Sequence, residues 1–209
     1  KIQTAGYMLK RTKGRFLLTL LVITGLAGTL KNTTLTQPER KLAVSELKKG
    51  KDRMLQSVKG LSEAQLSFKP AGQQQSIRDC MNQLVLAEQL LWQNLETTMK
   101  QPSADEPQGR KLGDREVLAQ AEGNYPDLLQ LQAATGHKQP AAGLTSFRTL
   151  RTEHIRYTRS TTEDLRDHFL QLPFGKIDAY QFILFIAACT DRYLRQIDQI
   201  KNAPGFPRT

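Results

Sequence analysis

The last helical stretch of the chain, residues 178–200, constrains the fold more than any other segment. Its apolar positions recur at three- and four-residue steps, and they are Phe182, Ile186, Cys189, Tyr193, Ile197 and Ile200. This spacing places them on one face of a helix, so Cys189 and Tyr193 are expected to point into a core. Asp178 supplies an N-cap oxygen, and Gln181 completes a capping box with it. The Asn-Ala-Pro-Gly sequence that follows ends the helix.

Two more helices are predicted in the first half of the chain. The first runs from about Pro38 to Lys59, and proline suits a first helical turn. A capping box beginning at Ser62 then opens only a short turn, because Lys-Pro-Ala-Gly soon breaks the chain. A second long helix is capped at Ser76 and ends near Met99.

The second half of the chain predicts one more long helix before the last. From Leu144 the inward positions are Phe147, Leu150, His154, Tyr157, Leu165 and Phe169, and a Pro-Phe-Gly sequence follows them. Between Lys100 and Gly143 the periodicity weakens, although short helical pieces are expected at 114–121 and 126–134. We recognise no strand alternation. Four long helices and one long crossover predict an all-α four-helix bundle.

The positive charge of the chain is concentrated at its N-terminal end. The formal net charge is +10, but residues 1–41 hold eight basic residues and one acidic residue, which leaves +3 for the other 168. Nucleic acid is therefore not expected as a partner, because binding to phosphates needs a dense basic surface.

The same N-terminal segment has the layout of a secretory signal. Basic residues at 10–15 precede an apolar run at 16–30, and small residues near Ala27 suit signal peptidase. The run is shorter than the roughly twenty residues that span a membrane. We expect an exported protein, periplasmic or extracytoplasmic, with a signal and polar lead-in at 1–36, the bundle at 37–201 and a disordered tail at 202–209. An uncleaved signal that anchors the chain remains the alternative, and it is the only membrane contact expected.

Several segments together resemble a known family. They are Phe68-Lys-Pro70, Ser76-Ile77, Gln83-Leu84 with Glu88, Leu172-Pro-Phe-Gly175, Asp178-Ala-Tyr-Gln181 and residues 186–197. Over roughly residues 38–201 the chain resembles the DinB-like family of bacterial four-helix bundles. The likeness is strongest in the last thirty of these residues.

The resemblance implies a metal site whose ligands are replaced. Family members that bind a divalent metal use three histidines, and the matching positions here are Gln83, Cys189 and Tyr193. An amide, a thiol and a phenol are poor ligands for zinc or nickel compared with three imidazoles, so we expect no metal and no cofactor. These residues either pack in the core or line a vestigial pocket in which Gln83 and Tyr193 hydrogen-bond. A disulfide between Cys80 and Cys189 is a third reading.

The histidines present do not replace the missing set. His154 falls on an inward stripe, where it is either an accessory ligand or a hydrogen-bonded histidine at the edge of the core. His137 and His168 have spacings unrelated to a metal motif. The sequence favours a non-catalytic or ligand-binding protein for an unidentified small molecule. The alternative is a metal-dependent hydrolase or thiol transferase that uses substitutes such as His154 and Cys189. A homodimer remains open.

Overall fold

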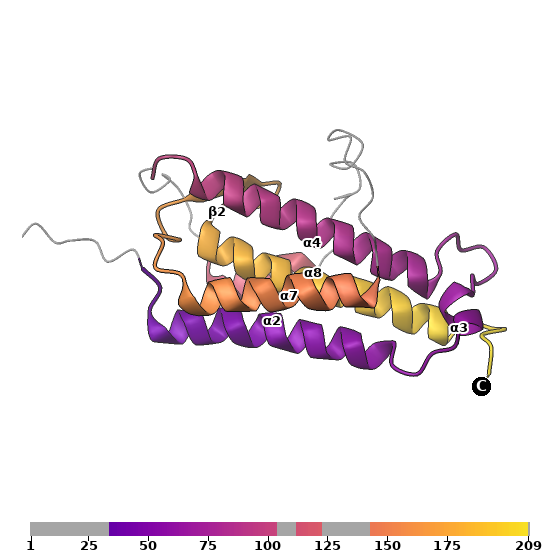
Figure 1. Ribbon diagram of the computed structural model, residues 1–209. Coiled ribbons are helices and arrows are strands. Elements are labelled where there is room, and N and C mark those ends of the chain that lie inside the picture. Colours follow the sequence, from indigo (N-terminus) through magenta and orange to yellow (C-terminus); the bar gives the residue numbers. More distant parts are fainter. Residues whose placement is uncertain (1–33, 104–111, 123–142, 209) are drawn as a thin grey trace, which may run out of the picture. The chain divides into compact units, whose positions relative to one another are not determined.

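The computed structural model describes residues 34–103, 112–122 and 143–208 (Figure 1). The segment predicted as a signal and the helical piece predicted at 126–134 lie outside the described residues. The described elements are α2 (Gln37–Ser57), α3 (Glu63–Ser67), α4 (Ile77–Met99), α5 (Asp114–Glu122), α7 (Leu144–Ser160), β1 (Phe169–Leu172), β2 (Gly175–Asp178) and α8 (Ala179–Lys201). This part of the chain is mostly helical, which confirms the predicted all-α class.

Capping boxes mark the starts of α2, α3, α4 and α8. The predicted boxes are present at Ser62 for α3, Ser76 for α4 and Asp178 for α8, and a further one at Thr36 begins α2. In each, the side chain of the cap residue accepts a backbone N–H of the first turn, and the side chain three residues later accepts the N–H of the cap. These bonds satisfy donors that a helix cannot satisfy itself, so local sequence sets the starts of these four helices.

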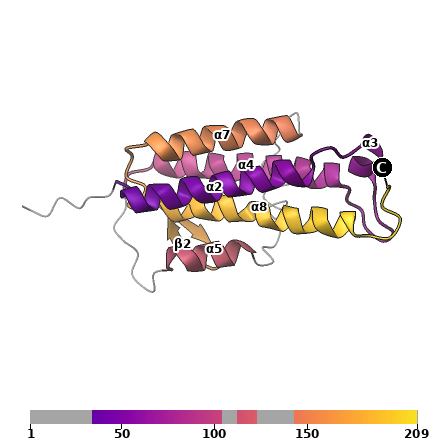
Figure 2. The same ribbon diagram turned by 90° about the horizontal axis from the view of Figure 1, so that it is seen from below.

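The four long helices form a bundle in which α2 and α4 each pack against both α7 and α8. Helices α4 and α7 run in the same direction, because Glu88 meets Arg151 and Trp92 meets Tyr157 further along both helices. The chain must therefore return along the length of α4 before α7 begins, a distance of about 35 Å for 23 residues. This geometry explains the long crossover. Helix α5 lies within it and packs on α8, on the side away from α7 (Figure 2).

Helix α8 is the central element of the bundle. Every residue from Ala179 to Thr190 is buried, because α2, α4, α5 and the hairpin all contact the helix. A helix that is apolar on all sides is expected in such a position. None of the described helices is both long and apolar enough to cross a membrane.

The prediction that the third helix extends to Phe169 is wrong. Helix α7 ends at Ser160, and Leu165 is buried beyond it in a turn. Phe169–Leu172 then pairs in antiparallel fashion with Gly175–Asp178, a short hairpin that the sequence pattern did not reveal. Gly175 has φ = 143°, a value that suits glycine in the tight turn between the strands. Each strand has only four residues, too few for alternation to be recognised.

Arg166, in the turn that precedes the hairpin, joins the end of the hairpin to α2 and α5. Its guanidinium donates hydrogen bonds to Asp178 at 2.6 Å and to Glu39 on α2, and it lies 3.4 Å from a carboxylate oxygen of Asp114 on α5. Gln181 adds a bond of 2.6 Å to the backbone carbonyl of Leu112. These contacts hold α5 in place and thereby fix the described part of the crossover against the start of α8.

The last described residues, which fall in the segment expected as a disordered tail, make contacts with the bundle. The rings of Phe206 and Phe68 meet edge to face with centroids 5.6 Å apart. Gln65 also donates a hydrogen bond of 3.0 Å to the carbonyl of Pro207. The aromatic contact was not predicted because it joins residues that are far apart in sequence.

Candidate functional site

Four polar side chains meet inside the bundle at its middle. Glu88 comes from α4, Arg151 and His154 come from α7, and Thr190 comes from α8. The Arg151 guanidinium donates to a Glu88 carboxylate oxygen and, at 2.8 Å, to the Thr190 hydroxyl. The other Glu88 oxygen lies 2.8 Å from Nδ1 of His154. All four residues are at most 2% exposed, so the network joins three helices inside the bundle.

The charges of this network are matched inside the core. Burial would raise the pKa of the Glu88 carboxyl, but the charge of Arg151 and the hydrogen bond from His154 outweigh burial and hold that pKa below its usual value. Glu88 is therefore ionised. Arg151 supplies one positive charge against it, although its Nε and Nη1 atoms have no hydrogen-bond partner among the described residues.

Gly50 on α2 leaves room for the buried guanidinium. A Cβ atom at this position would lie 3.5 Å from Nη1 of Arg151 and 3.4 Å from the Thr190 hydroxyl oxygen. Alanine fits at such distances, whereas a larger side chain would occupy the space of the network. The close approach of α2 to α8 thus depends on a small residue here.

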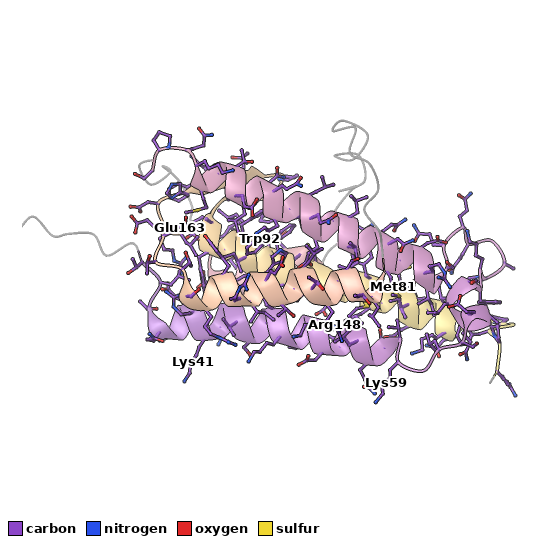
Figure 3. All side chains as sticks on the ribbon, in the orientation of Figure 1. Lys41, Lys59, Met81, Trp92, Arg148 and Glu163 are labelled. Carbon is purple, nitrogen blue, oxygen red and sulfur yellow. The ribbon has the colours of Figure 1, made fainter. Side chains whose placement is uncertain are left out.

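A groove of about 680 Å³ lies between α4 and α7, directly outside this network. His154 forms part of its wall, and its ring stacks on Trp92 with centroids 3.7 Å apart. The Tyr157 ring meets Trp92 edge to face, and its hydroxyl donates to Glu163. Figure 3 shows Trp92 between the ribbons of α4 and α7. The groove therefore combines fixed aromatic rings with a histidine that Glu88 holds from the core side by a hydrogen bond.

The three positions matched to family histidines lie in different surroundings. Cys189 and Tyr193 are each 7% exposed and belong to the core, as their spacing predicts. Gln83 is half-buried, and its side-chain oxygen accepts a hydrogen bond of 3.2 Å from Gln75. No hydrogen bond joins Gln83 to Tyr193 among the described residues. Cys80 and Cys189 are both free thiols.

The chemistry of these donors does not fit a divalent metal. Burial, together with the nearby Glu88 charge, raises the pKa of the Cys189 thiol to about 12. Burial likewise raises the pKa of the Tyr193 phenol. A metal ligand must be deprotonated, so both groups oppose binding, and the Gln83 amide is a weak ligand in any case. In residues 34–103, 112–122 and 143–208, no three His, Cys, Asp or Glu side chains are placed to hold a metal ion.

His154 was recognised from the sequence, but its partners were not. Glu88 lies four residues after Leu84 and three before Leu91, both of which are buried. Arg151 likewise follows Phe147 by four residues and precedes Ile155 by four. A charged residue on the apolar stripe of each helix is the available sign of a buried ion pair, because an unpaired charge is costly there.

We predict that Arg151→Met destabilises the bundle by about 3–5 kcal/mol, because it leaves the Glu88 charge buried and unpaired. Arg148→Met is the matched control, since Arg148 is exposed on the same helix. Urea unfolding followed by circular dichroism measures both. The double variant Glu88→Leu/Arg151→Met should recover much of the loss. An Arg151→Met variant as stable as Arg148→Met would show that the pair is unimportant.

Comparison with known proteins gives the family. A model of the DinB superfamily matches residues 46–197, which include α4, α7 and nearly all of α8. No curated protein and no solved structure matches the chain significantly. The matched region covers well over half of the 209 residues. The chain therefore belongs to the DinB superfamily.

Proposed function

We propose that this protein is a ligand-binding member of the DinB superfamily that works without a metal at the family's histidine positions. The observation that carries the proposal is the groove between α4 and α7, whose wall includes a histidine fixed by a buried ion pair. Its volume of about 680 Å³ falls within the range of small-molecule sites. The ligand is therefore a small organic molecule.

The wall of the groove indicates the kind of molecule. Trp92 and Tyr157 supply aromatic surface, and Leu150 supplies aliphatic surface, so part of the ligand is apolar. Glu96 and Glu153 place two carboxylates at the groove against the single guanidinium of Arg156. This balance favours a neutral or cationic ligand over an anionic one, although exposed charges act weakly.

The alternative is a metal-dependent hydrolase or thiol transferase with substitute ligands. It requires His154 and Cys189 to bind a metal together. The thiol of Cys189 is held protonated by burial, and the described residues hold no group of three His, Cys, Asp or Glu side chains that could bind a metal ion. Ligand binding without a metal is therefore the better-supported function.

We also propose that the protein is exported. The support is the order of a basic end, a short apolar core and small residues near Ala27 in the sequence. In mass spectrometry of the protein from its native host, we predict that residues 16–26 are absent. Recovery of those residues in the exported protein would contradict cleavage.

We predict that the emission of Trp92, the single tryptophan of the chain, reports binding in the groove. The probes are cyclohexylamine, cyclohexanol and cyclohexanecarboxylate, which share one apolar ring and differ in charge. We expect saturable changes in emission, with the amine bound more tightly than the carboxylate because two carboxylates line the groove.

Two variants of α4 make the test specific. Gln93 and Asn94 are both exposed, but only Gln93 belongs to the groove wall. Gln93→Phe should fill the groove and abolish the response, whereas Asn94→Phe should leave it unchanged. The absence of a saturable response in the natural protein, or an equal loss in both variants, would contradict the groove as the site.

A further inference from the structure

The two nitrogen atoms of His154 have different surroundings. Nδ1 lies 2.8 Å from Oε1 of Glu88, inside the core. Nε2, on the other side of the ring, makes no hydrogen bond to any described residue, and the ring forms part of the groove wall. The stacked ring of Trp92 covers a face of the imidazole and restrains its rotation.

The charge of Glu88 determines which nitrogen carries the proton. An ionised carboxylate only accepts hydrogen bonds, so Nδ1 of His154 must donate and must carry a hydrogen. Arg151 already balances the charge of Glu88. In a neutral imidazole whose Nδ1 donates the hydrogen bond, Nε2 keeps its lone pair.

We propose that Nε2 of His154 is the hydrogen-bond acceptor that anchors the ligand in the groove between α4 and α7. The inference rests on the proposed function and adds the class of ligand, a molecule with an apolar body and a hydroxyl or protonated amine as donor. Glu88 is a positioning residue in this arrangement, because it orients the ring and fixes the tautomer without reaching the groove.

The first test needs no ligand. Nitrogen-15 NMR of histidine-labelled full-length protein at neutral pH distinguishes a protonated ring nitrogen from a bare one. His154→Gln assigns the signals by removing those of His154 alone. The expected result is a protonated Nδ1 and a bare Nε2. A protonated Nε2, in the other tautomer or in the imidazolium, would overturn the inference even if the groove binds ligands.

The second test compares cyclohexanol with cyclohexyl methyl ether, which differ in the hydroxyl donor. The emission of Trp92 gives both dissociation constants. The ether should bind roughly tenfold more weakly, because one hydrogen bond is lost and its acceptor, Nε2, is left desolvated without a partner. Equal binding of the two compounds would overturn the inference about Nε2 but would still support the groove as the binding site. No binding of either would overturn the groove and the inference with it.

His154→Phe and His154→Gln separate a role in binding from a role in folding. Phenylalanine keeps an aromatic ring against Trp92 but has no acceptor, so the preference for cyclohexanol over the ether should disappear. Glutamine offers an amide N–H to Glu88 and a carbonyl oxygen to the groove, so it should restore part of that preference. If both variants keep the full preference for cyclohexanol over the ether, His154 does not contact the donor.

Discussion

The buried ion pair between Glu88 and Arg151 is the interaction on which the rest of the structure depends. It joins α4 to α7 in the middle of the bundle, and the Thr190 hydroxyl extends it to α8. Because two charges are taken out of water, neither can be removed alone without leaving the other uncompensated. The pair also holds Glu88 ionised, and Glu88 in turn orients His154 at the groove. One buried contact therefore links the packing of three helices to the chemistry of the groove wall.

The parts of the fold that depend on local sequence were predictable. The boxes at Ser76 and Asp178 gave the starts of α4 and α8, and the apolar stripes gave their buried faces. The end of α7 was not predicted, because Leu165 fits a helical period although it is buried from a turn beyond the helix. The sequence pointed to His154 but not to its pairing with Glu88, 66 residues away, because only the packing of α4 on α7 brings them together.

Membership of the DinB superfamily accounts for the arrangement of the helices. The chemistry of this chain depends instead on its own residues. At the positions that we propose to correspond to the family's histidines, Cys189 and Tyr193 are buried with raised pKa values, and Gln83 is bonded to Gln75. We propose that these side chains serve packing rather than coordination. The polar centre of the molecule instead lies at Glu88, Arg151 and His154, and it faces a groove on the α4–α7 side. We therefore propose that this bundle uses a hydrogen-bonding site in place of a metal site.

Calorimetric titration with Zn²⁺ tests this central claim most directly. The natural full-length protein is compared with the triple variant Gln83→His/Cys189→His/Tyr193→His, which restores three imidazoles at the family positions. We predict that the natural protein shows no tight stoichiometric binding and that the triple variant gains a site, because imidazoles replace a protonated thiol, a phenol and an amide. Tight binding of one zinc ion by the natural protein would contradict the replacement of the metal site.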